Sequence, residues 1–344
     1  MRRLIRGTAL TLILALLAVA GWTYYIVHRP FKGYSGEETF VEIPPGSGPL
    51  SMGRALTDAG VVTNPGAFRI AVWLRGAGRR LQAGEYRFDR PLTPGEVVDK
   101  IAKGDVFLQV ITFREGLTIR QMAAVFEERG FGPQAEFVAA ASRPDGVREL
   151  DPRATDLEGY LFPDTYALPR RTTAGQLTAR MVARFEKALT DEVRQQASGR
   201  GLSVRELVTL ASLVEKETAK PEERPLVAAV YSNRLKIGMG LQCDPTVIYA
   251  LERAGRYTGN LTRADLQFDS AYNTYRYAGL PPGPIAAPGK ASLEAAAQPA
   301  DVPYIYFVSR NDGSHAFAAS LDEHNRNVEE WQIRYFRERR RQAR

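Results

Sequence analysis

The sequence predicts a mixed α+β protein behind a single N-terminal transmembrane helix. Three observations predict it: an uncharged stretch near the N-terminus, recurring strand–turn–helix units in the first third of the chain, and helical periodicity in much of the rest. The chain has 344 residues, 44% of them hydrophobic, which suits one large domain or roughly two to three smaller ones. This composition excludes a disordered chain, a collagen-like repeat and a multi-pass transporter.

The anchor is predicted over residues 8–28. This segment includes 20 consecutive uncharged residues, about the number that a helix needs to cross a bilayer. Arginines precede it, so the positive-inside rule places residues 1–7 in the cytoplasm and exports the remainder. The alternative is a cleaved signal peptide, because Ala18-Val19-Ala20 resembles a cleavage site. Because the apolar run continues through Val27, a retained anchor is favoured.

The net charge of +7 is located at the chain ends. Three arginines lie within the first six residues, and residues 332–344 carry six arginines against one glutamate. The body between them is close to neutral, which argues against a nucleic-acid partner. Cys243 is the single cysteine, so no internal disulfide framework exists. No phosphate loop or H-E-x-x-H motif occurs, and we expect neither a cofactor nor a metal.

The exported part begins with a predicted polar tether at 29–39. Strand–turn–helix units follow, and their helices are expected to end at glycine. Further along, helices are predicted at 175–199, 203–220 and 224–237. Residues 238–303 are rich in Gly, Pro, Asn and Tyr and are predicted to form a long functional loop. The strands of the units are expected at 40–43, 83–88 and 110–113, and the helix ends at Gly60, Gly104 and Gly130.

The helix predicted at 203–220 carries the most informative carboxyls. Ser203 and Glu206 form a capping-box pattern at its start. Near its end, Glu215 and Glu217 point about 160° apart, because a helix turns about 100° per residue, so they cannot form a close pair. Glu217 extends the apolar face and Glu215 does not. Burial raises the pKa of a carboxyl and keeps it protonated as a general acid; the alternative is a solvated Glu217 paired with a nearby lysine.

Several motifs along the chain resemble the YceG-like (MltG-type) endolytic murein transglycosylases. The resemblance covers essentially the whole chain, with the motifs in family order. One departure is Cys243, where Thr or another small polar residue is expected. The motifs are Leu210–Thr218, Asn233–Tyr249, Ala271–Tyr275, Gly279–Gly289, Ala295–Ala300, Tyr304–Val308 and, upstream, Glu158–Tyr166.

The resemblance implies a single-pass inner-membrane protein with a periplasmic catalytic domain. It implies a LysM-like α+β subdomain at 40–105, a mixed α+β catalytic domain at 106–330 with an active-site helix, and a basic tail at 331–344. The implied catalytic acid is the second glutamate of Glu-Lys-Glu-Thr, Glu217. The implied substrate is peptidoglycan, cut to 1,6-anhydro-MurNAc ends, and the implied partners are peptidoglycan synthases of elongation or division.

Five further residues within the motifs are candidates for binding the sugar. Each also has a structural interpretation: Asp244 could begin a helix, and Asn273 could shape a turn. Two other functions stay open, a muramidase with a second acid such as Glu158 or Asp244, and a non-catalytic glycan-binding membrane scaffold. The binding candidates are Glu158, Gln242, Asp244, Asn273 and Tyr275.

Overall fold

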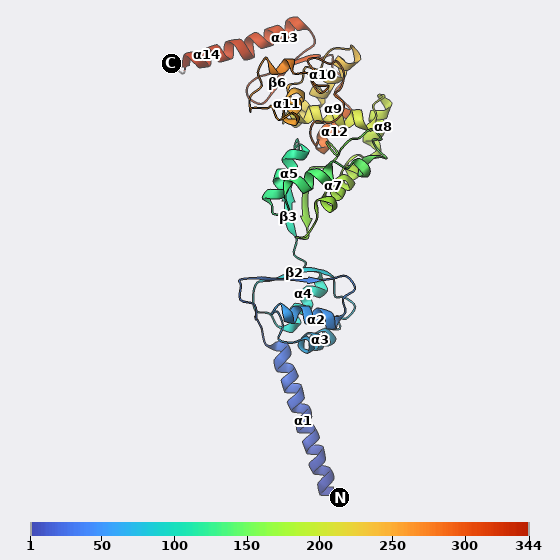
Figure 1. Cartoon of the computed structure of the whole chain (residues 1–344), viewed down its shortest axis with the longest axis vertical. Coiled ribbons are helices and arrows are strands. Elements are labelled where there is room, and N and C mark those ends of the chain that lie inside the picture. Colours follow the sequence, from blue (N-terminus) through green and yellow to red (C-terminus); the bar gives the residue numbers. More distant parts are fainter. Residues whose placement is uncertain (1, 343–344) are drawn as a thin grey trace. The chain divides into compact units, whose positions relative to one another are not determined.

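The computed structural model describes residues 2–342 and divides into two compact units (Figure 1). The N-terminal unit holds the chain as far as Val110 together with Ala167–Arg170, and the C-terminal unit holds the rest. Each sheet in the described chain has two strands, in the pairs β1–β2, β3–β4 and β5–β6. The mixed α+β class predicted from the sequence is therefore confirmed.

The first helix, α1 (Arg2–His28), contains an apolar segment from Leu10 to His28 that is long enough to cross a membrane. Its composition suits an anchor and a signal sequence alike. The segment is almost entirely exposed, except that Val27 is buried in the core of the N-terminal unit. The outer end of α1 is thus part of that unit's packing.

The N-terminal unit places two helices between two antiparallel strands. Strand β1 (Thr39–Ile43) pairs with β2 (Gly84–Phe88) along their whole lengths. Between them lie α2 (Pro49–Asp58) and α3 (Pro65–Leu74), and α4 (Pro94–Lys103) follows. The order is therefore strand, helix, helix, strand, and the LysM-like assignment of residues 40–105 stays a prediction. The helices begin and end at local signals, including the Asn64 cap of α3, the capping box of Thr93 with Glu96, and the left-handed Gly104 after α4.

Residues 29–39, predicted as a tether, lie against the N-terminal unit. Phe31 forms a β-bridge with Leu92, and the Gly33 amide donates to the Gly60 carbonyl at 2.8 Å. Gly60 has a φ of +71°, and a Cβ there would lie 2.7 Å from the Gly33 carbonyl carbon. Only glycine allows this close approach of the two backbones. The segment is therefore packed, and its hydrogen bonds leave it little freedom as a linker.

The C-terminal unit is mainly helical around α9 (Val204–Glu217), whose residues Leu207 to Val214 are all buried. Helix α9 packs against α10 (Arg224–Lys236), α11 (Asp244–Arg253) and α12 (Lys290–Ala297). The hairpin β5 (Tyr306–Ser309) and β6 (His315–Ala318) follows. Between α4 and residue 170 the chain forms β3 (Gln109–Thr112), α5 (Ile119–Glu128), α6 (Gln134–Ala141) and β4 (Thr165–Leu168).

Three sequence predictions for this unit need correction. The helix predicted at 175–199 is two helices, α7 (Ala174–Ala188) and α8 (Asp191–Gly199), because Thr190 leaves the helix and accepts a hydrogen bond from the Val193 amide. The helix predicted at 203–220 ends at Glu217, where Thr218 becomes extended. The loop predicted at 238–303 contains α11 and α12.

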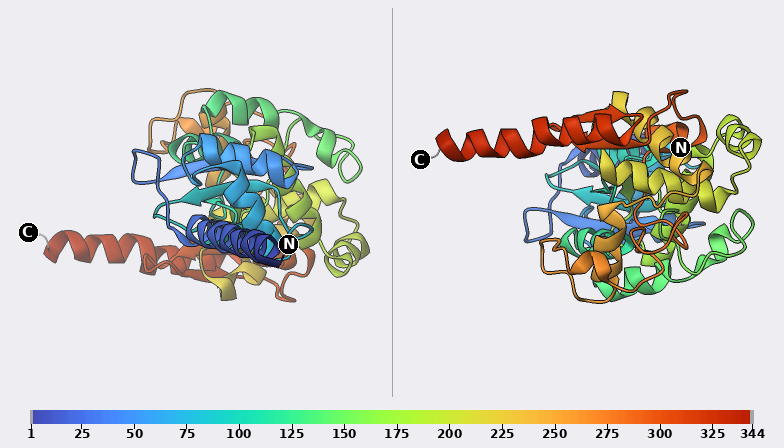
Figure 2. Two further views of the ribbon diagram at one scale, coloured as in Figure 1. Left: turned by 90° about the horizontal axis from the view of Figure 1, so that it is seen from below. Right: turned by 90° about the horizontal axis from the view of Figure 1, so that it is seen from above.

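The basic C-terminus, left open by the sequence, is helical in the described residues. Helix α13 (Leu321–Val328), a π-helical turn (Glu329–Arg334) and α14 (Tyr335–Gln342) run on without a break. They project from the C-terminal unit as one helical arm (Figure 2). The side chains of the last turn are mostly charged, whereas Leu321, Ile333 and Phe336 along the arm are exposed apolar residues.

Candidate active site

Helix α9 ends at Glu217 because the next residue leaves the helical conformation. Thr218 has φ −137° and ψ 135°, and its hydroxyl donates to Glu223 Oε2 at 3.1 Å. The Lys220 amide in turn donates to Thr218 Oγ1. These bonds fix the chain reversal after α9 and hold the last helical side chain at the end of the apolar face. The prediction that Glu217 extends this face matches the position of the residue.

Glu217 faces side chains from α10 and from the start of α11. The Cys243 thiol donates to Glu217 Oε2 over 3.8 Å, which is a weak sulfur hydrogen bond. The buried Tyr231 hydroxyl lies close enough to lower the pKa of this carboxyl, yet it makes no hydrogen bond of regular geometry. Glu217 thus has no strong donor, and its oxygens stay available to a ligand.

The pKa of Glu217 is raised to about 7. Desolvation by burial is the largest cause, and the negative charge of Asp244 adds to it, whereas Tyr231 and Cys243 oppose it. The partial negative charge at the C-terminal end of α9 also disfavours the anion. Burial raises the pKa of the Cys243 thiol well above its usual range, so the thiol keeps its proton. At neutral pH a substantial share of Glu217 is therefore protonated, as a general acid requires.

A ridge of polar groups stands beside this carboxyl. The Tyr275 hydroxyl donates to Asp244 Oδ1 at 2.5 Å, so these two predicted binding residues lie together. Gln242 precedes the buried Cys243, is itself exposed, and has a φ of +51°. A left-handed backbone is uncommon for glutamine, and such strain often accompanies functional sites. The structure brings Gln242, Asp244 and Tyr275 to the neighbourhood of Glu217.

Glu217 lines an open cleft of about 620 Å³. Within it, Glu215 is already engaged: it accepts hydrogen bonds from the Gly289 amide at 2.9 Å and the Ser292 hydroxyl at 2.7 Å, and it faces the Arg224 guanidinium at 3.5 Å. Burial and the neighbouring Glu215 raise the pKa of Glu115 across the cleft. Of the two glutamates near the end of α9, Glu215 is therefore bound to other residues of the cleft lining, and Glu217 is the one that faces the open cleft. The lining residues are Phe113, Arg114, Glu115, Glu215, Lys216, Glu217, Thr218, Ala219 and Arg224.

Two predicted binding residues have structural partners instead. Asn273 is fully buried, and its amide donates to the carbonyls of Leu266 and Phe268 while its Oδ1 accepts from the Tyr275 amide. The prediction that Asn273 touches substrate is corrected accordingly: it shapes the loop that carries Tyr275.

Glu158 is the second correction. It is 7% exposed, accepts hydrogen bonds from the Ile119 amide and the Tyr249 hydroxyl, and lines a different pocket, so the structure does not bring it into the Glu217 cleft. Burial raises its pKa to about 8. Its two hydrogen bonds join the start of α5 to α11.

Sequence reasoning missed two contributors to the site. Tyr231 and Arg234, one helical turn apart on α10, both face the Glu217 neighbourhood and act on its pKa. Arg234 donates to the carbonyls of Leu241 and Ile305, which holds the backbone just before Gln242. Arg234 lies inside a quoted motif, so the motif was a usable signal; Tyr231 had none, because its role depends on tertiary packing.

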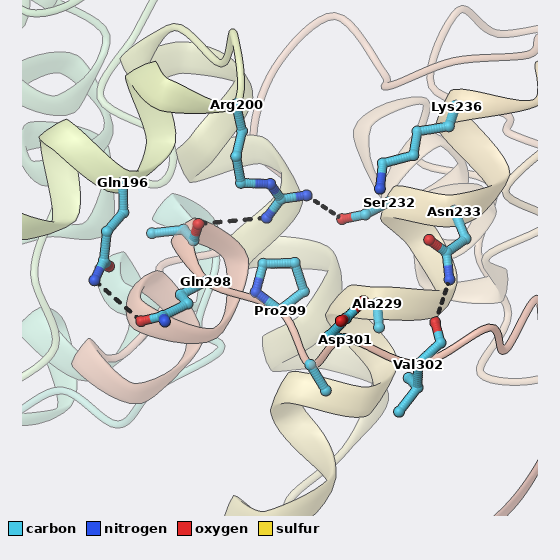
Figure 3. A pocket seen from close by; sticks show the side chains of 12 residues that line it. Gln196, Arg200, Ala229, Ser232, Asn233, Lys236, Gln298, Pro299, Asp301 and Val302 are labelled. Carbon is cyan, nitrogen blue, oxygen red and sulfur yellow. Dashed lines mark hydrogen bonds between the residues drawn. The ribbon is translucent and has the colours of Figure 1, made fainter.

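A second depression in the unit lies between α8, α10 and the end of α12 (Figure 3). Its polar side chains serve structural bonds: Arg200 donates to Ser232 and to the Ala296 carbonyl, and Gln196 donates to Gln298. In the described residues, no cluster of three or more His, Cys, Asp and Glu side chains is placed to hold a metal ion.

Glu217, a partly buried acid at a helix end that faces an open cleft, is a candidate general acid. The YceG-like family profile matches residues 41–330. The chain therefore belongs to the YceG-like family.

Proteins of known name and structure extend this comparison. The chain is 30% identical over 318 residues to a protein named endolytic murein transglycosylase of Bacillus subtilis, covering 88% of this chain and 87% of that protein. It is 31% identical over 353 residues to a protein of the same name from Streptococcus pneumoniae, covering 92% of this chain but 63% of that longer protein. A crystal structure of a YceG-like protein of Listeria monocytogenes superposes with a TM-score of 0.58 at 31% identity, covering 85% of this chain and 99% of that one.

Proposed function

We propose that the protein is a lytic murein transglycosylase that cuts inside peptidoglycan glycan strands. The relatives' names support this class. The observation that carries the chemistry is Glu217, the carboxyl in the open cleft whose pKa is raised to about 7 and whose oxygens lack strong donors. Hydrolytic glycosidases usually need two acting carboxyls, whereas a transglycosylase needs one acid because its nucleophile comes from the substrate.

In the proposed reaction, protonated Glu217 donates its proton to O4, the oxygen that bridges MurNAc C1 and GlcNAc C4. The C1–O4 bond breaks, and GlcNAc leaves with a neutral 4-hydroxyl. The same MurNAc's O6 then attacks C1, and the Glu217 carboxylate takes the O6 proton. The product is a 1,6-anhydro-MurNAc end, the acid is regenerated, and no water is consumed. Intramolecular attack provides the proximity advantage that a bound water would have to match.

The neighbours of Glu217 suit the charge that develops in this reaction. Asp244 is an exposed carboxyl whose negative charge favours both a protonated Glu217 and a positively charged sugar ring. Tyr275 holds Asp244 through a 2.5 Å hydrogen bond. Exposed Gln242, next to Cys243, provides an amide that can donate to and accept from sugar hydroxyls. We assign these three residues to sugar binding and orientation.

The test is digestion of purified peptidoglycan by the full-length chain in detergent, with mass analysis of the fragments. Wild type should release internal fragments with anhydro-MurNAc ends, and Glu217→Gln should release none. Glu222→Gln is the matched control: it makes the same change at an exposed glutamate five residues further along, and it should cut like wild type.

Other outcomes would change the assignment. Products one water heavier, with reducing MurNAc ends, would indicate a muramidase, and Asp244 would be the second carboxyl to test. A Glu217→Gln variant that cuts like wild type would refute the assignment of the acid. Binding of glycan without any cutting would indicate a scaffold.

We further propose that α1 is a retained anchor, with residues 1–7 in the cytoplasm and both units in the periplasm of the inner membrane. The arginines that precede the span and the length of its apolar segment support it. Contact with peptidoglycan synthases stays a prediction from the family resemblance.

A further inference from the structure

The most exposed large apolar side chain in the described chain is in the N-terminal unit. Trp73 is 79% exposed, more than any described residue of the apolar segment of α1, and its neighbour Leu74 is 54% exposed. Both lie at the C-terminal end of α3, whose inner face buries Phe68 and Val72. Single exposed leucines are common on protein surfaces. A largely exposed tryptophan beside a second exposed apolar residue is instead a candidate interaction site.

The same stretch of chain is strongly basic. Residues 59–84 contain four arginines and no acidic residue or lysine. Arg75 is paired with Asp99, and Arg80 donates to the Arg75 carbonyl at 3.3 Å, while Arg69, Arg79 and Arg80 are all exposed within a few residues of Trp73 and Leu74. Arg69 and Trp73 are four residues apart and so share one face of α3. Exposed aromatic and aliphatic side chains ringed by arginines are typical of elements that lie in the interface of an anionic bilayer.

The position of α3 relative to the candidate span points to the same partner. Helix α1 packs against α3 and α4, and Val27 lies in the same core as Phe68 and Val72 (Figure 1). The apolar segment of 19 residues ends at His28 and spans about 28 Å at 1.5 Å per residue, close to the thickness of the hydrocarbon core. No helical length is left over between the bilayer and the N-terminal unit, which brings the α3 side of that unit to the lipid headgroups.

We propose that the end of α3, Trp73 and Leu74 with Arg69, Arg79 and Arg80, forms a second membrane contact that docks the N-terminal unit on the anionic surface of the bilayer. This inference rests on the proposed anchor, because α1 brings the surface to the lipid. It adds an orientation: the span alone fixes one point, and a second contact stops the unit from turning about the axis of α1. The ligand is the bilayer, with tryptophan at the level of the headgroups and arginines on phosphate.

The three tryptophans of the chain allow a direct test, because one lies in each relevant place. Trp22 is in the candidate span, Trp73 is at the proposed contact and Trp331 is in the C-terminal helical arm. Full-length chains that keep one tryptophan, with the other two changed to phenylalanine, would be reconstituted in phosphatidylglycerol–phosphatidylcholine bilayers whose acyl chains carry bromine. Bromine quenches only rings that reach the acyl chains, and aqueous iodide quenches those in water.

We expect strong bromine quenching of Trp22, intermediate quenching and a blue-shifted emission for Trp73, and iodide quenching alone for Trp331. If Trp22 is quenched but Trp73 responds only to iodide, the contact is refuted while the anchor stands. If Trp22 is not quenched either, the anchor of the proposed function has failed first. A Trp73 shielded from both quenchers would indicate a protein partner and would overturn the lipid assignment.

A second arm tests the charge. The triple change Arg69→Gln, Arg79→Gln and Arg80→Gln in the Trp73-only chain should reduce bromine quenching of Trp73 in anionic bilayers and leave Trp22 quenching unchanged in the matched Trp22-only chain. Pure phosphatidylcholine should reduce it in the same way. If bromine quenching of Trp73 is the same after the arginine substitutions and in pure phosphatidylcholine, the arginines do not contribute, and the contact as proposed is wrong.

Discussion

Two carboxyls of the C-terminal unit, the buried Glu158 and the partly buried Glu217, have pKa values raised by the same main cause. Burial raises the first to about 8 and the second to about 7. Their surroundings differ. Glu158 is bonded to the Ile119 amide and the Tyr249 hydroxyl, whereas the hydrogen bond at Glu217 is from a thiol 3.8 Å away. A raised pKa therefore marks burial, and the availability of the oxygens separates an active-site candidate from a structural carboxyl.

The largest effect expected from this comparison is on turnover. Glu217→Gln should lower the rate of peptidoglycan cleavage by between about 10² and 10⁴-fold, the usual contribution of a general acid. Glu158→Gln keeps an oxygen acceptor for the Ile119 amide and should change the rate by less than about tenfold. Initial rates of fragment release by the two variants would check this. A larger loss at Glu158 would reverse the assignment of the two sites.

The next effect is on stability. The folded-state pKa of Glu217 lies above its unfolded value of 4.5, so the folded chain binds the extra proton and loses stability as pH rises from about 4.5 to 7. The cost above pH 7 is at most about 3 kcal/mol, at about 1.36 kcal/mol for each pKa unit. Glu217→Gln cannot ionise, so it should be more stable than wild type at pH 8 and nearly equal at pH 4.5.

Urea unfolding of both chains at these two pH values would measure the difference. The Glu222→Gln control should show no such pH-dependent gain, because that glutamate is exposed. An equal difference between wild type and Glu217→Gln at pH 4.5 and pH 8 would mean that Glu217 is ionised without penalty in the folded state.

A smaller effect is expected in the pH profile. Cleavage should fall as pH rises through about 7, because Glu217 loses the proton that it must donate. Cys243→Thr replaces a weak sulfur donor with a hydroxyl, which is a stronger donor to the Glu217 carboxylate. The pKa of Glu217 should therefore fall, and the fall in cleavage rate should begin at a pH lower by less than about one unit. The apparent pKa of kcat/KM in the two chains gives the answer. A fall in rate that moves to higher pH in Cys243→Thr would show that Cys243 does not act as a donor.

The smallest effect concerns the strained backbone at Gln242. Gln242→Gly removes the side chain but suits a φ of +51°, so it should raise stability by up to about 1 kcal/mol while raising KM. Gln242→Ala removes the same side chain and keeps the strain, so it should raise KM alone. If both variants leave KM unchanged, Gln242 does not bind the sugar.

Local features of this fold could be predicted from sequence, and tertiary ones could not. The Ser203–Glu206 capping box and the glycines after α2 and α4 depend on residues three or four positions apart, so they can be recognised in the sequence. The break between α7 and α8 was missed because the amphipathic period continues through Leu189 and one threonine ends it. Proline and glycine around α11 and α12 concealed two short helices.

The candidate site also has features that the sequence could predict and features that depend on tertiary contacts. The orientation of Glu217 follows from helical periodicity along α9, and its role stays a proposal. The engagement of Glu215 with Ser292, and that of Asn273 with its own loop, depends on which distant backbone atoms the fold brings near. The membrane-facing arginines of residues 59–84 were overlooked because the charge was summed over the whole body, where acidic residues elsewhere hide a local excess.

The bonds of Glu223 have a consequence for the order of synthesis. This residue accepts from Thr218, directly after the proposed acid, and from the backbone and ring of His315, which lies 92 residues further along the chain. The end of α9 therefore gains its last fixed partner only when the β5–β6 hairpin has been made. A chain truncated before this hairpin lacks that support, so the cleft is fully assembled only after nearly the whole protein has been made.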